Sequence, residues 1–347
     1  MLRPKSEGFD GKKEVFRMKK YRIACVVLFL LVFLFAAGCG GTGKGEDLYF
    51  AMPQPMANTA EGWTVVPWEV YRYTGGETYS LAYTLPDAGD YALGIAGAHL
   101  YYVPMNGGPV TCVDLKGGGE KALGELPSGW VSYMVAEEGE GEDRVFAPWS
   151  NGEQRKVYEI SAGKARVICE DAVLNAELAL GDGGLFYIDN AQGMALLRYD
   201  LKTGETRKIA DKVGSGKLEY DSGYVYSSSV DTYSYDVLTG EKTYIAPGSG
   251  YRVRDGWLYY ADYADDSADR DPAWIAFMRR NLKNGKTESC GTAYVPYLGD
   301  QTFRRTVVFG KKGFVVFQSY VKEDTDYTYF PYRASQGIAL HPAENSP

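Results

Sequence analysis

The sequence predicts an all-β fold, more specifically a β-propeller of seven four-stranded blades, with six blades as the alternative. Composition is the first observation behind this prediction, because the 347 residues include 42 Gly and 29 Tyr but only two His. Glycine favours tight turns and tyrosine favours half-buried strands. The second observation is a pattern that recurs about every forty residues between residues 61 and 342. This period is typical of propeller blades rather than of helical solenoids.

Each repeat contains two hairpins. A glycine turn leads into an aromatic-rich strand, and after a loop a second hairpin again turns at glycine. The clearest copies lie at 182–189 with 197–205, at 221–226 with 235–241, and at 254–260 with 280–285. Their D-G, T-G and N-G dipeptides supply the positive φ angles that tight hairpins require.

Four weaker copies complete a set of seven. They lie at 100–102 with Gly117, at 145–146 with Gly163, at 314–317 with Gly337, and, in partial form, at 62–66 with 70–76. The partial copy lacks a clear leading strand, so we expect the other end of the chain to supply one. One four-stranded sheet cannot bury both faces, and we therefore expect the units to stack around an axis. A pair of β-sandwiches is the alternative, but it would not explain why both turns recur in order.

The repeat also resembles a known family. An aromatic Y-Y strand is followed by R-x-[DN]-L-x-[TN]-G, as in Tyr259-Tyr260 and the run from Arg280 to Gly285. This pattern is similar to that of a bacterial extracytoplasmic propeller family known only as a domain of unknown function. The resemblance implies the fold and not the function, because the matching residues are structural and propellers have many functions.

The N-terminal region resembles a bacterial lipoprotein signal. A cationic segment, Met18-Lys19-Lys20-Tyr21-Arg22, precedes an apolar run from Ile23 to Ala37, and the small residues that follow end on Cys39. The resemblance implies that Cys39 receives a diacylglyceryl group and becomes the first residue of the mature protein. A transmembrane anchor is the alternative, but the apolar run has 15 residues, fewer than the roughly 20 that span a bilayer as a helix.

These features divide the chain into four segments. We expect a signal segment at 1–38, a lipidated cysteine and short tether at 39–60, one propeller domain at 61–342, and a tail at 343–347. Met18 is the expected start, because Glu7, Asp10 and Glu14 do not suit a cationic leader. A genuine long leader is the alternative.

Charge narrows the range of partners. Residues 1–38 hold eight of the 37 basic and three of the 45 acidic residues, so the mature chain carries a net charge of −13. Such a surface disfavours nucleic acid and is repelled by anionic lipid headgroups. We therefore expect the lipid on Cys39 to hold the protein on the extracytoplasmic side of the membrane.

Three cysteines remain in the mature fold, Cys112, Cys169 and Cys290. Their odd number excludes complete pairing, and their wide spacing shows no C-x-x-C pattern of a metal site. We interpret them as small buried apolar side chains. One disulfide with one free thiol is the alternative.

Function is expected on the loops between the second and third strands of the repeats. These loops lie on the face opposite the glycine hairpins and differ in length, and variable loops on a rigid scaffold commonly carry binding groups. The candidate ligand-binding residues in or beside these loops are Trp149, Asp189, Asp231, Asp265, Asp266, Asp269, Trp274 and Tyr320.

Each candidate has a structural alternative. The acidic loop around Asp265 suggests calcium, but it lacks the D-x-D-x-D-G spacing that wraps one cation, so a solvated loop is preferred. The aromatic residues could stack on sugar rings or simply fill the space between blades. His99 and His341 have no evident catalytic partner, and the sequence has no G-x-S-x-G, H-E-x-x-H or phosphate-binding glycine loop. A carboxylate pair for glycoside hydrolysis is set by distance in space, so it stays open.

The sequence therefore predicts a non-enzymatic binding lipoprotein that holds an envelope protein, a glycan or a peptide on its loops. No cofactor and no metal are expected. Two alternatives belong to other classes: an enzyme that degrades an extracellular polymer, as a glycoside hydrolase or lyase, and a scaffold within an envelope assembly.

Overall fold

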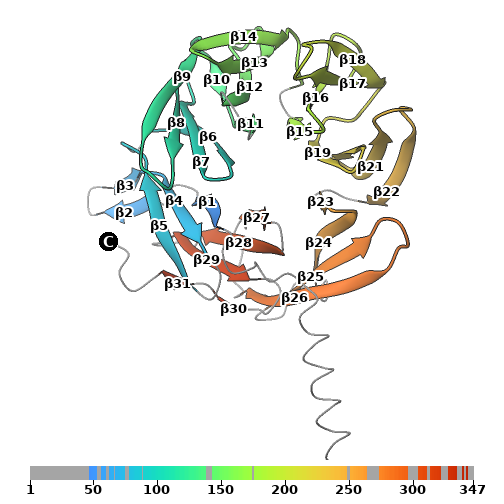
Figure 1. The fold of residues 1–347 in the computed structure, drawn as a ribbon. Coiled ribbons are helices and arrows are strands. Elements are labelled where there is room, and N and C mark those ends of the chain that lie inside the picture. Colours follow the sequence, from blue (N-terminus) through green and yellow to red (C-terminus); the bar gives the residue numbers. More distant parts are fainter. Residues whose placement is uncertain are drawn as a thin grey trace, which may run out of the picture.

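The computed structural model is an all-β ring of sheets around one axis (Figure 1). It describes residues 47–52, 56–59, 62–65, 67–74, 78–87, 89–137, 143–173, 176–247, 251–263, 273–295, 304–310, 313–321, 327–333, 338–339 and 341–342. Every regular element within these ranges is a β-strand.

The strands form consecutive sheets, each listed from the axis outward. The first contains β1 (Leu48–Met52), β4 (Glu69–Tyr73), β5 (Thr78–Thr84) and β31 (His341–Pro342). The second contains β6 (Tyr91–Ala96), β7 (His99–Pro104), β8 (Gly108–Asp114) and β9 (Glu120–Leu126). The third contains β10 (Trp130–Val131), β11 (Val135–Glu137), β12 (Arg144–Ser150), β13 (Arg155–Ser161) and β14 (Lys164–Cys169).

Four regular sheets complete the ring. They are β15 (Ala179–Gly181), β16 (Gly184–Asp189), β17 (Ala195–Asp200) and β18 (Thr206–Ala210); β19 (Lys217–Asp221), β20 (Tyr224–Ser228), β21 (Asp231–Asp236) and β22 (Lys242–Pro247); β23 (Arg252–Arg254), β24 (Trp257–Tyr263), β25 (Ala273–Asn281) and β26 (Thr287–Val295); and β27 (Arg304–Gly310), β28 (Gly313–Val321), β29 (Tyr327–Arg333) and β30 (Ile338–Ala339). A separate hairpin, β2 (Met56–Thr59) with β3 (Gly62–Val65), lies between β1 and β4 in the chain.

The expectation of seven four-stranded blades is corrected. The structure has six blades of four strands, the number given as the alternative, and the remaining sheet has five strands. Its inner edge is divided into two short strands, because both β10 and β11 pair with β12. Three residues outside regular structure separate β10 from β11, so one straight inner strand does not form there.

The first sheet begins earlier than expected and closes the ring. Strand β1 begins at Leu48, within the segment that we assigned to the tether, and it pairs with β4. The C-terminal strand β31 pairs in parallel with β5, so a strand from the other end of the chain does join this sheet. Joining the two ends of the chain in one sheet holds the ring closed.

Strand β16 shows how the sequence builds the core. Its residues from Gly184 to Ile188 are all buried, because sheets cover both of its faces. Leu185 and Tyr187 pack toward the preceding sheet with Phe146, whereas Phe186 packs toward the following sheet with Val225. Alternate side chains of a strand point to opposite faces, so the continuous apolar run of β16 fills the interfaces with both neighbouring sheets. Each such buried side chain contributes about 1.5–3 kcal/mol.

The three cysteines of the expected mature fold are buried. Cys112, Cys169 and Cys290 are each at most 5% exposed, which agrees with their interpretation as small apolar side chains. Burial raises the pKa of Cys112 to about 11 and that of Cys169 to about 12, so both thiols stay protonated and unreactive near neutral pH.

Candidate functional site

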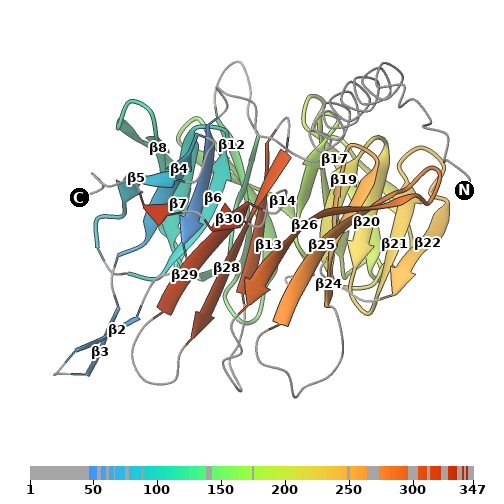
Figure 2. The ribbon, with the colours of Figure 1, turned by 90° about the horizontal axis from the view of Figure 1, so that it is seen from below.

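The two faces of the ring are built differently (Figure 2). The turn face carries the connections from the first to the second and from the third to the fourth strand of the regular sheets. In three of these four sheets they have the same lengths: two residues join β15 to β16, β19 to β20 and β23 to β24, and five join β17 to β18, β21 to β22 and β25 to β26. The opposite loop face carries the connections between the second and third strands. There two residues join β20 to β21, whereas nine join β24 to β25.

The loop face also carries an insertion. The β2–β3 hairpin projects from the ring on this side, beside the first sheet (Figure 2). Strands β24 and β28 lead toward the same face with seven and nine residues, whereas β20 has five. The nine-residue connection and the inserted hairpin therefore lie on the same face, whereas the longest connection between a first and a second strand on the turn face is the six residues between β11 and β12.

Polar groups of the turn face are used within the turns. The Asp200 carboxylate accepts hydrogen bonds from the backbone N–H of Lys202 at 3.0 Å and of Thr203 at 2.9 Å. The Thr203 bond is the main cause that lowers the pKa of Asp200, to about 2. Asp236 makes the equivalent bonds in the next sheet. These carboxylates stabilise turns and are not available to a ligand.

Trp149, the first candidate of the sequence, is a packing residue. Its side chain lies on β12 and is only 4% exposed. The indole N–H donates to the Pro127 carbonyl at 2.9 Å, and the ring packs edge-on against Tyr158 at 5.7 Å between centroids. Because its polar and apolar atoms are both satisfied inside the protein, we no longer propose that Trp149 contacts a ligand.

Trp130 occupies the surface position that we had expected for Trp149. It lies on β10, directly opposite Ser150 at the loop-face end of β12, and is 55% exposed. The neighbouring Val131 donates its N–H to the Met105 carbonyl, which places β10 beside the β7–β8 connection. Trp130 was not predicted as a site residue, because its repeat has no regular leading strand. Of the large hydrophobic side chains described on the loop face, Trp130 and Val230, which is 83% exposed, are the most open.

Asp189 lies on the loop face and organises its own connection. Its carboxylate accepts hydrogen bonds from the Gln192 backbone N–H at 3.4 Å and from the Gln192 side-chain amide at 3.1 Å. The adjacent Asn190 donates to the Asp171 carboxylate at 3.0 Å. Carboxylate and amide groups of two neighbouring sheets thus lie together at the surface. Such groups can exchange hydrogen bonds with the hydroxyl or amide groups of a ligand.

Asp231 begins β21, at the shortest loop of this face. Its carbonyl accepts from the Ser229 N–H, and its carboxylate accepts from the Tyr233 hydroxyl at 3.4 Å. The carboxylate is only partly engaged, so Asp231 stays a candidate. It is adjacent in the chain to the exposed Val230.

The remaining candidates are only partly covered. Cys39, Asp265, Asp266 and Asp269 lie outside the described residues. Trp274 lies on β25 and Tyr320 on β28, near the loop-face ends of those strands, but only their backbone is described. The acidic residues belong to the nine-residue connection between β24 and β25, the longest between second and third strands.

A charged cluster at the inner strands was not predicted. The Glu219 carboxylate on β19 accepts from the Arg252 guanidinium at 2.6 Å and from the Val253 N–H at 2.5 Å, both in the next sheet. Lys217 lies 3.9 Å from Glu219 and 3.3 Å from Glu177. The alternation of polar and apolar residues along 217–221 could have indicated an inner strand with polar side chains on one face, and the repeat period could have indicated its neighbouring strand.

Burial dominates the electrostatics of this cluster. It raises the pKa of Glu219 to about 8, and the Glu177 and Asp221 carboxylates add to the rise while the Val253 N–H opposes it. Burial likewise lowers the pKa of Arg252. Both oxygens of Glu219 are nevertheless engaged by the next sheet. We therefore assign the cluster to the joining of sheets and not to acid–base catalysis.

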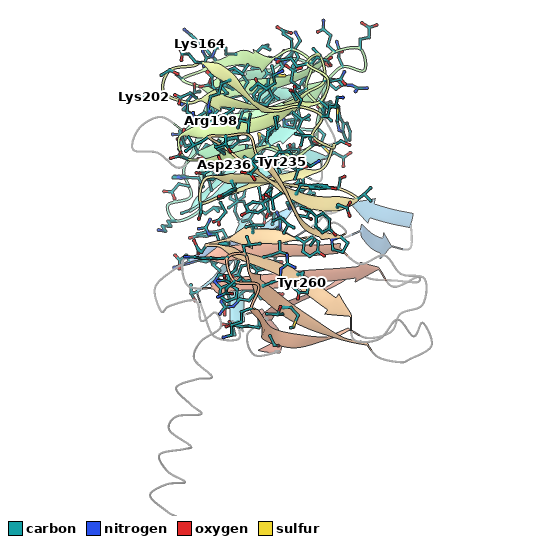
Figure 3. All side chains as sticks on the ribbon, turned by 90° about the vertical axis from the view of Figure 1, so that its right-hand side faces the viewer. Lys164, Arg198, Lys202, Tyr235, Asp236 and Tyr260 are labelled. Carbon is teal, nitrogen blue, oxygen red and sulfur yellow. The ribbon has the colours of Figure 1, made fainter. Side chains whose placement is uncertain are left out.

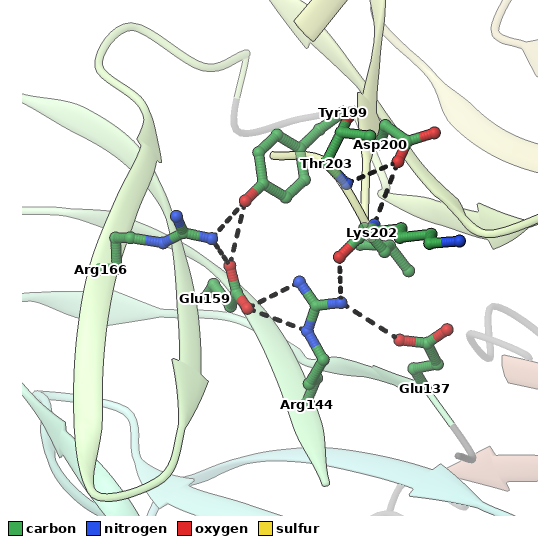
Figure 4. A network of polar contacts seen from close by, with 9 residues as sticks. Glu137, Arg144, Glu159, Arg166, Tyr199, Asp200, Lys202 and Thr203 are labelled. Atoms are coloured by element: carbon green, nitrogen blue, oxygen red, sulfur yellow. Dashed lines mark hydrogen bonds and ion pairs between the residues drawn. The ribbon is translucent and has the colours of Figure 1, made fainter. Parts of the chain in front are cut away.

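A second network joins β10–β14 to the following sheet (Figure 4). The Glu159 carboxylate, 5% exposed, accepts from Arg144 at 2.7–2.9 Å, from Arg166, and from the Tyr199 hydroxyl at 3.3 Å. Arg144 also donates to the Leu201 carbonyl at 2.6 Å. Burial raises the pKa of Glu159, but the two arginines outweigh it and lower the pKa overall. This buried anion is fully paired and structural.

Within the described residues, no group of three or more His, Cys, Asp or Glu side chains is placed to hold a metal ion. The same part of the chain contains no helix long and apolar enough to cross a membrane.

No family model matches the chain, and neither does any curated protein. Among solved structures, the chain is similar to puromycin hydrolase, with a TM-score of 0.54 and 13% identity over 89% of this chain and 55% of that one. A mutant of puromycin hydrolase gives a TM-score of 0.53 at 14% identity, with the same coverage. BamB from Moraxella catarrhalis gives 0.42 at 13% identity, over 86% of this chain and 97% of that one.

The fold is a β-propeller. The chain spans about half the length of the puromycin hydrolase chains, and identities this low support the fold alone. The all-β propeller prediction is confirmed. The lipoprotein signal and the resemblance to an uncharacterised propeller family stay predictions.

Proposed function

We propose that this protein is a lipid-anchored extracytoplasmic binding module. Cys39 would carry the lipid, and the loop face would hold a protein, peptide or glycan of the cell envelope. The observation that carries the proposal is the asymmetry of the ring. One face has uniform turns whose carboxylates are engaged internally, whereas the other has connections of two to nine residues and a projecting hairpin. A surface that varies from blade to blade suits recognition of one particular partner.

The described side chains of the loop face support binding by stacking and hydrogen bonding. Trp130 exposes more than half of its surface, and aromatic side chains of this kind supply large contact areas in interfaces. Carboxylate and amide groups lie on the same face in the next two sheets. They belong to Asp189, Asn190 and Gln192 at the β16–β17 connection and to Asp231 at the start of β21. Asp265, Asp266, Asp269, Trp274 and Tyr320 complete the proposed face.

The anchor is tested by metabolic labelling with a fatty-acid probe. The wild-type chain should take up the probe, and Cys39→Ser should not. Serine keeps the size of the side chain but cannot form the thioether, so loss of label and release from membranes are both expected. Equal label on the two chains would contradict the lipid anchor.

Partner capture from solubilised envelopes tests the binding face. A loop-face variant, Trp130→Ala with Asp231→Ala, should retain less of the partner set that wild type retains. A matched turn-face variant, Tyr224→Ala with Thr239→Ala, replaces similar surface residues and should retain all of it. Each chain is first compared by thermal melting, so that loss of capture is not loss of fold. Equal capture by both variants would move the site away from the loop face.

A further inference from the structure

Strand β1 begins at the turn face. Its last residue, Met52, pairs with Glu69, and the neighbouring Trp68 carbonyl accepts from the N–H of Leu85. Leu85 directly follows β5, and the chain then leads to Tyr91 at the start of β6, which pairs with Pro104 at the loop-face end of β7. Met52 is therefore at the loop face, as the β2–β3 hairpin that follows it also shows (Figure 2). The start of β1 is at the opposite end of the strand.

The position of β1 limits how the ring can lie on a membrane. Nine residue steps separate Cys39 from Leu48, and a fully extended chain of that length spans at most about 32 Å. A seven-residue blade strand such as β12 spans about 23 Å. A lipid on Cys39 therefore keeps the turn face near the membrane, whereas the loop face could reach it only if the tether ran back along the height of a blade.

The tips of the turn face carry a repeated set of side chains. In the five-residue turns, the second residue after the capping Asp or Asn is Lys116, Lys202, Leu238 and Lys283 in successive copies, and Lys164 follows the two-residue turn of β13 and β14. All five are exposed, and Leu238, at 86%, is the most exposed large hydrophobic side chain described. Figure 3 shows Lys164 and Lys202 on this face.

The lysines of this set are available to anions. Within the described residues, none of the four forms an ion pair. The carboxylates closest to them in the chain, Asp114 and Asp200, accept backbone hydrogen bonds inside their turns. The turns of this face also carry the exposed Asp182, Glu205, Glu241 and Asp255. The local distribution of both charges, and not the net charge alone, decides how the protein is oriented at a charged surface.

We propose that the turn face docks on the anionic membrane surface to which the chain is tethered. Lys116, Lys164, Lys202 and Lys283 contact lipid phosphate groups, and Leu238 enters the headgroup region. The loop face then points away from the membrane, toward partners in the envelope. This orientation rests on the proposed lipid anchor, and it replaces the expectation that anionic headgroups simply repel the protein.

Energy transfer to the membrane tests the orientation. A donor dye is attached to Thr239→Cys on the turn face or to Gln192→Cys on the loop face of the full chain, and an acceptor is placed on the headgroups of phosphatidylcholine vesicles with phosphatidylglycerol. Cys112 and Cys169 are buried and unreactive, and a lipidated Cys39 is blocked. We expect efficient transfer from position 239 and weak transfer from position 192.

The outcomes separate the orientation from the anchor. Equal or reversed transfer in a membrane-bound chain would overturn the orientation and leave the anchor standing. No transfer from either position, with Cys39 itself open to the dye, would overturn both.

Surface variants test which side chains make the contact. Leu238→Asp should weaken binding to phosphatidylglycerol vesicles several-fold. Glutamine at all four lysines should weaken it by a few hundredfold, because each lysine near such a surface contributes about a fivefold factor. Val230→Asp is the matched control, since Val230 is equally exposed but lies on the loop face, and it should bind as wild type does. The same loss from Val230→Asp, or no loss from Leu238→Asp, would overturn the proposal. Binding to an anionic polysaccharide but not to vesicles would identify a different partner and overturn it as well.

Discussion

The turn face and the loop face are made from the same strands, yet they use their side chains differently. On the turn face, Asp200 and Asp236 close their own turns, and Gly204 and Gly240 adopt φ angles of 74°. On the loop face, connections between second and third strands range from two to nine residues, and both Val230 in one of them and Trp130 on β10 are exposed. The difference teaches that a turn keeps one geometry where an Asp side chain must accept its backbone N–H groups. Connections without this requirement vary in length and sequence.

The largest effect is expected at a turn-face glycine. Gly240→Val should lower the free energy of unfolding by about 3 kcal/mol or more, because a β-branched residue is strained at positive φ and its Cβ would meet the Ile209 carbonyl oxygen at 2.4 Å. Gly204→Val has the same φ but open space, with the nearest atom 3.6 Å away, so we expect about 1–2 kcal/mol. Chemical denaturation compares the two. Equal losses would show that strain alone acts, and no loss in either would break the account of the turn face.

The second largest change in the free energy of unfolding is expected at the Glu219–Arg252 contact between two neighbouring sheets. Glu219→Ala removes the hydrogen-bond partner of Arg252, whose side chain is 29% exposed, and this loss costs about 1–3 kcal/mol, whereas Glu219→Gln keeps a neutral side chain of the same shape. Because the folded-state pKa of Glu219 is about 8, above its value of roughly 4.3 in the unfolded chain, the folded state binds the extra proton between these values. Wild-type stability relative to Glu219→Gln should therefore fall as pH rises from about 5 to about 9. A difference that stays constant with pH would contradict the raised pKa.

The turn caps should show the opposite dependence on pH. The pKa of Asp200 is lowered to about 2, so its ionised form stabilises the folded state above its unfolded value of about 3.9, and this contribution is lost as pH falls toward 2. Asp200→Asn should melt at a lower temperature than wild type at pH 6, and the gap should close under acid. A gap that widens in acid would show that Asp200 does not cap the turn as an anion.

The smallest effects are expected on the loop face. Asp189→Ala, or alanine at Asp265, Asp266 and Asp269, should change the free energy of unfolding by less than about 0.5 kcal/mol, because exposed loop residues make few buried contacts. The acidic trio also tests calcium. A wild-type melting temperature that rises with added calcium, while that of the triple variant does not, would replace the solvated-loop interpretation with a cation site.

The sequence was sufficient for the parts of the fold that depend on local chemistry. The D-G and T-G turns occur where predicted, with positive φ at Gly183, Gly256, Gly204 and Gly240, because the turn residues themselves determine that geometry. The start of the first sheet was missed, since the β2–β3 hairpin separates β1 from its partner β4 in the chain. Pairing across such an insertion depends on contacts that no local pattern records.

The candidate site was only partly predictable for a similar reason. Which tryptophan is exposed depends on the neighbouring sheet: Trp149 is covered by the Pro127 to Gly129 segment, and Trp130 is left open. The Glu219–Arg252 contact joins residues 33 positions apart, about one repeat. The repeat could have predicted that these two sheets are neighbours, but not which individual side chains meet between them.

Photo-crosslinking in living cells tests the central claim most directly, namely that envelope partners bind the loop face and not the turn face. A photoreactive phenylalanine analogue is placed at Trp130 and Gln192 on the loop face, and at Tyr224 and Thr239 on the turn face, all exposed in the structure. The account predicts protein or glycan adducts of defined size from the loop-face positions, and only lipid adducts or none from the turn-face positions. The same envelope adducts from Tyr224 and Thr239, with none from Trp130 and Gln192, would contradict it.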